Sequence, residues 1–249
     1  MKFAPTAALL AAMTLAAPAM ALDLDAMSDA ERAAFRAEVR AYLLDNPEVL
    51  MEAIAVLEAR EAAARDAADV ALVQDNAAAI FDDGHSWVGG NPDGDVTLVE
   101  FVDYRCGYCR RAASAVKELI ETDGNIRLVM KEFPILGEAS DVSSRFAIAT
   151  LLVAGDAAYE QVHDALLALQ GEPTDVTLVR LAGGLGLDGD AILAGMTDPE
   201  VERIIAANRD LARTLQITGT PTFVLETELL RGFVPLDGMR EIVAQVRAE

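Results

Sequence analysis

The sequence predicts an α/β fold with a helical insertion, preceded by a helical N-terminal arm. Three observations support this prediction. A buried-looking strand, a helix and a second strand follow one another over residues 96–130, a mostly helical block covers about 140–215, and a hairpin and a final helix occupy 222–246. A strand–helix–strand unit normally has a right-handed crossover and parallel strands, which makes it a natural centre for the sheet.

The first residues are typical of an export signal. Lys2 supplies the positive start, an uncharged apolar stretch covers residues 7–17, and the segment 18–21 ends in an Ala-x-Ala cleavage pattern. The apolar stretch is shorter than the ~20 residues of a membrane span, so cleavage is favoured over a retained anchor. We therefore expect residues 1–21 to be a signal peptide, the mature chain to begin near Leu22, and the protein to be periplasmic.

Residues 22–80 are predicted to form the helical arm. Ser28 and Glu31 make a capping-box pattern at its start, and Pro47 disfavours a helical conformation at the residue before it. Apolar residues then recur every seven positions at Val49, Val56, Ala63, Val70 and Ala77. The pattern fits an amphipathic helix packed on its own domain or a self-association arm, and the length of helix favours self-association.

The second region, residues 81–249, holds the predicted sheet. Its first part should contain a loop around Trp87 at 82–95 and two buried strands at 96–102 and 126–130. A helix at 110–122 should connect the two strands. The helical insertion should contain five pieces, at 142–154, 157–170, 176–184, 191–196 and 199–215. His163 is expected on the surface of the second piece. The hairpin strands are expected at 222–225 and 229–233, and the last helix at 236–246.

Charge excludes one class of function. The chain has 41 acidic and 20 basic residues, a formal net charge of −21, and the acidic residues are scattered. Nucleic-acid binding needs basic patches that displace counterions from phosphates, so it is not expected.

The only two cysteines, Cys106 and Cys109, are separated by two residues. A structural disulfide is one possibility, but a bridge across so short a loop constrains the unfolded chain little. A zinc site would need more ligands, and His85 and His163 have no suitable spacing. The spacing therefore favours redox chemistry.

The position of the pair suggests separate roles. Cys106 should lie at a helix N-terminus, where unpaired N–H groups and the helix dipole favour a thiolate, so we predict that it is the nucleophile. Cys109 lies one turn further and should resolve the mixed disulfide. Gly107 and Tyr108, between the cysteines, should tune the redox balance.

Glu100 is unusual because it interrupts an otherwise apolar strand. It must either reach solvent or have a raised pKa. A protonatable group beneath the cysteines could exchange a proton with Cys109, so we predict a catalytic role for Glu100. Asp103 and Arg105 are expected to tune the surface next to the thiol.

Several motifs together resemble the DsbA-like thioredoxin superfamily. They are Phe101–Tyr104 leading into Cys106–Arg110, then Lys131–Pro134 and Gly219–Phe223. The resemblance implies a thioredoxin fold with a helical insertion, and places Glu100 at the family's buried acidic position. Sequence alone would make the Thr220–Pro221 bond trans, but the resemblance implies a cis-proline loop beside the cysteines that pairs with a substrate strand. Gly107, Tyr108, Thr220 and Pro221 are thus the expected substrate-binding residues.

The arm resembles the N-terminal region of ScsC-type (suppressor of copper sensitivity) proteins over residues 32–57, including the segment Leu44–Leu50. The resemblance implies that the arm forms a homo-oligomer, with a trimer as the expected state.

Two details resemble the disulfide isomerase DsbC: the Cys-Gly-Tyr-Cys active site and a threonine before the proline. DsbA proteins usually have Cys-Pro-His-Cys and valine. We therefore expect a disulfide isomerase or reductase that acts on cysteine-containing exported proteins and is kept reduced by a membrane partner of the DsbD or ScsB kind. The alternatives are a DsbA-like oxidase served by a DsbB-like enzyme and a copper(I)-binding tolerance protein. No cofactor beyond a redox-active Cys106–Cys109 disulfide, and no resident metal, is expected.

Overall fold

A computed structural model describes residues 26–248. The predicted signal peptide and cleavage site lie outside the described residues. The chain divides into two compact units, one ending at Arg60 and the other beginning at Glu61, and each is described separately.

The first unit is helical. It contains α1 (Asp29–Asp45) and the beginning of α2 (Glu48–Asp75). Ser28 caps α1 as predicted, since its hydroxyl accepts from the N–H of Glu31 and its own N–H donates to the Glu31 carboxylate at 2.9 Å. The two helices are separated at Asn46–Pro47, where the proline disfavours helical backbone at the preceding residue.

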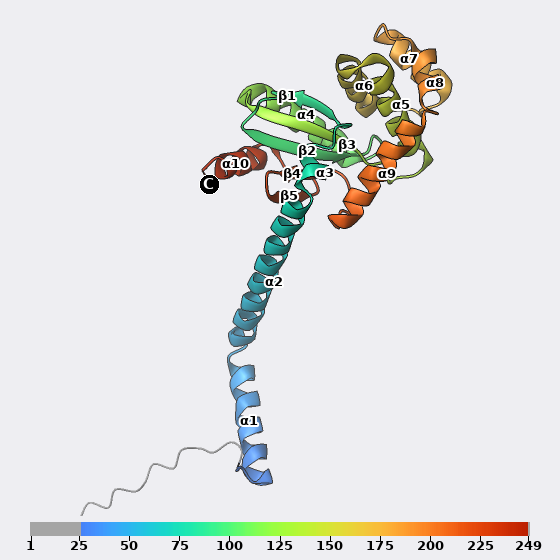
Figure 1. Ribbon diagram of the computed structural model, residues 1–249. Coiled ribbons are helices and arrows are strands. Elements are labelled where there is room, and N and C mark those ends of the chain that lie inside the picture. The colour runs from blue at the N-terminus through green and yellow to red at the C-terminus, as the bar shows by residue number, and fades with distance from the viewer. Residues whose placement is uncertain (1–25, 249) are drawn as a thin grey trace, which may run out of the picture. The chain divides into compact units, whose positions relative to one another are not determined.

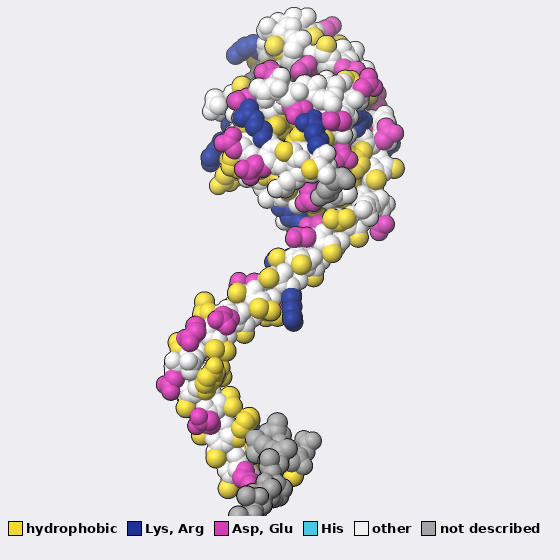
Figure 2. Space-filling view, turned by 90° about the vertical axis from the view of Figure 1, so that its left-hand side faces the viewer, with side chains coloured by type: hydrophobic (Ala, Val, Ile, Leu, Met, Phe, Trp, Pro, Cys, Tyr) yellow, Lys and Arg dark blue, Asp and Glu magenta, His cyan; other side chains and the backbone are white. Residues whose placement is uncertain are grey.

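Apolar side chains of this unit are exposed rather than packed on a core. No residue of α1 is buried. Figure 2 shows hydrophobic side chains along the helices. The large exposed apolar residues are Phe35, Val39, Tyr42, Leu44, Leu50, Met51, Ile54, Val56 and Leu57. A surface of this kind usually marks an interaction site.

The second unit contains a five-stranded sheet and eight further helices within the described residues. The strands are β1 (Trp87–Gly90), β2 (Val96–Val102), β3 (Ile126–Glu132), β4 (Thr222–Leu225) and β5 (Glu228–Arg231). The helices that begin in this unit are α3 (Ala77–Phe81), α4 (Gly107–Asp123), α5 (Glu138–Ala154), α6 (Asp156–Ala168), α7 (Asp175–Gly184), α8 (Gly189–Gly195), α9 (Pro199–Thr214) and α10 (Leu236–Val246). The α/β fold with a helical insertion is confirmed.

The strand order is β1-β3-β2-β4-β5, so β2 is the central strand. It pairs parallel with β3 and antiparallel with β4. The helix α4 connects β2 to β3 and is capped at its C-terminus by Gly124, whose φ of 74° is a left-handed conformation that glycine adopts without strain. The strand–helix–strand segment β2–α4–β3 brings the predicted cysteine pair to the carboxyl end of the central strand.

One strand differs from the sequence-based expectation. The segment around Trp87, predicted as loop, forms the edge strand β1 antiparallel to β3. Its four residues include two glycines, a composition that does not indicate a strand. Gly89 has a packing reason, because a Cβ there would lie within 3 Å of the Trp87 ring.

The two faces of the sheet have separate cores. Figure 1 shows α4 and α10 on the sheet, with α5–α8 to one side of it. The first core includes Leu98, Val102, Leu128 and Met130 of the strands together with residues of α4, α6 and α10. The opposite face packs Val99, Phe101 and Val129 against residues of α3, the end of α2 and α9.

The helix α9 joins both cores. Ile205 lies in the first core, whereas Leu211 and Ala212 lie in the second. The predicted insertion of about 140–215 therefore includes a helix that also covers the sheet.

Candidate functional site

The two cysteines lie at the start of α4. Cys106 is the N-cap residue of this helix and Cys109 lies in its first turn. Both are free thiols. Cys106 retains 7% exposure and Cys109 has none, so only Cys106 offers its sulfur to a partner. The helix N-terminus directs unpaired N–H groups and the positive end of the helix dipole toward Cys106.

Burial separates the second thiol from the first. It raises the pKa of Cys109 well above its usual value, and the nearby Glu100 and Cys106 add to the increase. A thiol in this environment ionises only when a neighbouring group accepts its proton.

The proline loop lies against Cys106. The Cys106 thiol donates to the carbonyl oxygen of Thr220 at 3.1 Å. The Thr220–Pro221 peptide bond is cis, as the family resemblance implies. Residues 218–222 line a small pocket of about 140 Å³ together with Arg231 and Gly232. The structure therefore brings the predicted cysteine and proline motifs together although they are more than 100 residues apart.

Gly107 and Tyr108 are exposed beside this loop. Tyr108 is 58% exposed. The Arg111 guanidinium lies 5.7 Å from the Tyr108 ring centre and 5.0 Å from that of Phe233. These contacts form a polar and aromatic surface next to the thiol.

Glu100 is buried in the centre of β2, with 4% exposure, and does not occupy an edge. Burial, and then the charge of Glu132, raise its pKa to about 8. Its carboxyl can therefore gain or lose a proton near neutral pH, which an ordinary glutamate cannot do.

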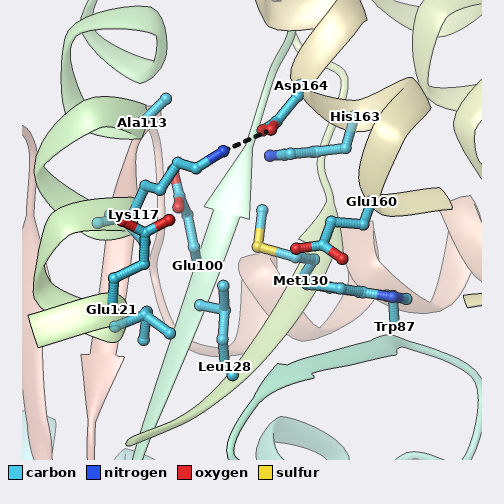
Figure 3. A pocket seen from close by; sticks show the side chains of 13 residues that line it. Trp87, Glu100, Ala113, Lys117, Glu121, Leu128, Met130, Glu160, His163 and Asp164 are labelled. Atoms are coloured by element: carbon cyan, nitrogen blue, oxygen red, sulfur yellow. Dashed lines mark hydrogen bonds and ion pairs between the residues drawn. The ribbon is translucent and has the colours of Figure 1, made fainter. Parts of the chain in front are cut away.

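A pocket gives access to Glu100. Figure 3 shows its side chain between Lys117 and Glu121 of α4 and His163 and Asp164 of α6. The pocket has a volume of about 110 Å³. It lies on the sheet face covered by α4 and α6, and has room for water-sized molecules next to the Glu100 carboxyl.

His163 is not ordinary helix surface, contrary to the sequence-based expectation. It is half-buried, and its Nδ1 lies 3.0 Å from the Tyr104 hydroxyl. Burial lowers its pKa to about 4. The helical periodicity of α6 could not reveal this role, because the partner comes from the distant active-site loop.

Asp103 is also buried rather than a surface residue. Its carboxyl accepts from the N–H groups of Arg105, Ile135 and Leu136 at 2.8–3.1 Å and from the Ser140 hydroxyl at 2.8 Å. It thus ties the loop before Cys106 to the loop after β3. Arg105 lies closer to the surface position expected for it. It is half-buried and donates to the carbonyl of Gly171.

Sequence reasoning missed one buried carboxyl. Glu132, at the end of β3, is 3% exposed and accepts hydrogen bonds from Tyr104 and Tyr159. In the sequence it stands within the family motif Lys131–Pro134, which assigns it no separate role. The available signal was a second acidic residue at the end of an apolar strand next to the one that carries Glu100.

The fold and this dithiol define a thiol–disulfide oxidoreductase. The model of the DsbA-like thioredoxin domain matches residues 97–244, and that of the N-terminal domain of the copper resistance protein ScsC matches residues 31–64. The chain belongs to the DsbA-like thioredoxin domain family.

Solved structures agree with this assignment. A thioredoxin-like oxidoreductase from Silicibacter pomeroyi is 41% identical, with a TM-score of 0.65, over 69% of this chain and 98% of that one. The thiol-disulfide exchange protein α-DsbA2 from Wolbachia pipientis is 30% identical, with a TM-score of 0.69, over 74% of this chain and 98% of that one. A linker-deletion mutant of Proteus mirabilis ScsC is 25% identical, with a TM-score of 0.66, over 91% of this chain and 99% of that one.

The curated relatives that match are much longer proteins. A Na(+)/H(+) antiporter NhaA 3 from Salinispora tropica is 35% identical over 136 residues, which cover 55% of this chain and 21% of the antiporter. The chain spans between a fifth and a quarter of the length of such relatives. Within residues 26–248, no helix combines the length and apolar character required to cross a bilayer.

Proposed function

We propose that this protein is a periplasmic disulfide isomerase or reductase that acts through Cys106 and Cys109. The observation that carries this proposal is the unequal pair of thiols, with Cys106 at the helix N-terminus beside Thr220 and Cys109 buried above a protonatable Glu100. Cysteine-containing exported proteins would be the substrates.

The first step follows from the position of Cys106. Its thiolate attacks one sulfur of a client disulfide, forms a mixed disulfide, and releases the other client sulfur as a thiolate. The exposed Gly107 and Tyr108 and the half-buried Thr220 would contact the client chain here, with Pro221 holding the loop beside the thiol.

Two steps can follow. In isomerisation, another client thiolate attacks the client sulfur of the mixed disulfide, which forms a new client disulfide and restores the Cys106 thiolate. In reduction, the Cys109 thiol passes its proton to the Glu100 carboxylate, and its sulfur attacks that of Cys106. The products are the Cys106–Cys109 disulfide and a reduced client.

The environment of Cys109 favours isomerisation. Its thiol has a raised pKa, and Glu100, with a pKa of about 8, is mostly protonated at neutral pH. Both conditions slow the attack of Cys109, so the mixed disulfide survives long enough for the client to rearrange.

We also propose that the arm forms a homo-oligomer, with a trimer as the expected state. Its support is the exposed apolar surface of α1 and α2 together with the ScsC-type match over residues 31–64. Several thiolates around one misfolded client would serve an isomerase. A membrane partner of the DsbD or ScsB kind would return the dithiol to its reduced form.

Periplasmic location is proposed on the N-terminal export pattern in the sequence. Cell fractionation followed by mass spectrometry of the mature protein tests it. A chain that begins near Leu22 in the periplasmic fraction supports export, and an uncleaved chain in the cytoplasm contradicts it.

Reactivation of scrambled ribonuclease tests the isomerase proposal. The reduced protein should restore ribonuclease activity, and Cys106→Ser should not. Rapid oxidation of reduced ribonuclease by the disulfide form of the protein, with no reactivation by the reduced form, would favour the DsbA-like oxidase, which the match of residues 97–244 to the DsbA-like model also supports. Tight binding of Cu(I) by the reduced dithiol would favour the copper-tolerance alternative, which the match of residues 31–64 to the N-terminal domain of the copper resistance protein ScsC supports.

A further inference from the structure

A second buried carboxyl lies behind the active-site loop. The hydroxyl groups of Tyr104 and Tyr159 both donate to Glu132 Oε1 at 2.6 Å. The main-chain oxygen of Glu132 accepts from the Asn208 side chain at 3.1 Å. Three separate parts of the fold thus hold this residue: the loop after β2, α6 and α9.

Tyr104 connects this carboxyl to the nucleophile, because it lies two residues before Cys106. Its carbonyl oxygen accepts from the Arg110 guanidinium at 3.1 and 3.3 Å. Because its hydroxyl donates to Glu132, the same oxygen accepts from His163 Nδ1 at 3.0 Å. Both ends of Tyr104 are therefore fixed, and the position of the loop before Cys106 depends on Glu132.

Glu132 also shares a sheet face with Glu100. Glu100 is paired with Met130 in the parallel register of β2 and β3, and Glu132 lies two residues beyond Met130. Side chains two residues apart on a strand point to the same face. The two carboxyls consequently interact, and the charge of Glu132 disfavours ionisation of Glu100.

The charged and titratable groups around Glu132 come from several elements. They are Glu100 of β2, Asp103 and Tyr104 of the following loop, and Tyr159 of α6, with His163 behind Tyr104. Burial raises the pKa of Glu132 to about 7 against the effect of its hydrogen bonds. His163 is neutral at this pH because burial lowers its pKa to about 4. Glu132 therefore changes its charge in the same pH range as Glu100.

We propose that Glu132 is a positioning residue for thiol–disulfide exchange, which holds the loop before Cys106 through Tyr104 and, by its negative charge, makes the Glu100 carboxylate a stronger acceptor for the proton that Cys109 gives up. The inference rests on the proposed function, since it assigns a role in the Cys109 step. A merely structural Glu132 would be replaced by a neutral isostere without any change in the pH dependence of that step.

Release of thionitrobenzoate from an aromatic disulfide reagent tests the proposal on the full-length reduced protein. Attack by Cys106 releases one aromatic thiolate and leaves a mixed disulfide. Attack by Cys109 on Cys106 then releases the second thiolate. Stopped-flow absorbance separates the two phases, and the second phase reports the Cys109 step across a range of pH.

Glu132→Gln keeps an oxygen that accepts from both tyrosines but removes the charge. The pH midpoint of the second phase should fall by about one unit, because Glu100 loses a like-charged neighbour. Glu132→Asp, which keeps the charge, should retain a midpoint close to that of the unmodified protein. Glu241→Gln, on the exposed face of α10, changes the net charge equally and should leave the midpoint unchanged.

An unchanged midpoint in folded Glu132→Gln would overturn the inference and leave the proposed function standing. Absence of a second phase in the unmodified protein would instead contradict the dithiol mechanism, and the inference with it. If Glu132→Gln does not fold, Tyr159→Phe serves in its place. It removes one hydrogen bond to Glu132 and disfavours its charge, so a smaller shift in the same direction is expected, and no shift would overturn the proposal.

Discussion

The thiol of Cys106 donates to the carbonyl oxygen of Thr220 at 3.1 Å. At this contact the N-terminus of α4 meets a loop that lies 114 residues further along the chain. Because the acceptor is a backbone atom, its position depends on the loop rather than on the threonine side chain. The contact marks where an approaching client disulfide can reach Cys106, which is the one thiol of the pair that retains some exposure.

The roles of the thiols predict different products from two matched variants. Cys109→Ser should form a stable mixed disulfide with a peptide disulfide, because nothing resolves it. Cys106→Ser should form almost none, since Cys109 is fully buried. Mass spectrometry of the intact protein without reductant measures both, and equal adducts on the two variants would contradict these roles.

Glu100 should make stability depend on pH. Its pKa is about 8 in the folded protein and near 4.5 when unfolded, so the folded state binds the proton more tightly. The free energy of unfolding contributed by this group should fall as the pH rises from about 4.5 to 8. Glu100→Gln removes this dependence, and its melting temperature should exceed that of the unmodified protein most at about pH 8.

Thermal melts at several pH values and constant ionic strength measure the effect. Glu160→Gln is the matched control, because Glu160 lines the same pocket but is exposed. A melting-temperature difference for Glu100→Gln that shrinks as the pH rises would contradict the assigned pKa direction.

Asp103 should contribute strongly to stability. Asp103→Ala would leave three N–H groups and one hydroxyl without their acceptor, and should cost about 3 kcal/mol in the free energy of unfolding. Asp164→Ala removes an exposed ion pair with Lys117 and should cost about 1 kcal/mol or less. Chemical denaturation measures both, and similar small losses would show that the Asp103 contacts do not hold the loop.

The arm should control the oligomeric state. Leu50→Glu combined with Ile54→Glu places charge on the exposed apolar surface of α2 and should reduce the molar mass measured by light scattering to that of a monomer. Val176→Glu is the control, since Val176 is also an exposed apolar residue, with 68% exposure, but lies on α7 and not on the arm. A monomeric unmodified protein, or an oligomer that survives the double substitution, would contradict the prediction.

Local patterns predicted most of the elements. The Ser28 capping box, the break at Pro47 and the final helix 236–246 depend on neighbouring residues, and the structure has them where the sequence places them. The Cys106–Cys109 spacing and the position of Glu100 in an apolar strand were also visible in sequence, because strand burial follows from the run of apolar residues.

The misses depend on contacts between distant segments. The strand at Trp87 forms because β3 offers it a partner, and its glycines gave no strand signal. Asp103 and His163 look like surface residues until the loop after β3 and the loop before Cys106 fold onto them. The interaction of Glu132 with Glu100 requires the register of β2 on β3, which no local pattern contains.

The most direct test of the central claim, that the two thiols are unequal, is the rate of alkylation of each cysteine in the reduced protein. Iodoacetamide treatment near neutral pH, followed by peptide mass spectrometry over time, gives both rates at once. The structure predicts that Cys106 is modified first and that Cys109 stays largely unmodified while the protein is folded. Faster modification of Cys109, or equal rates in the folded protein, would contradict the assignment of nucleophile and resolving thiol.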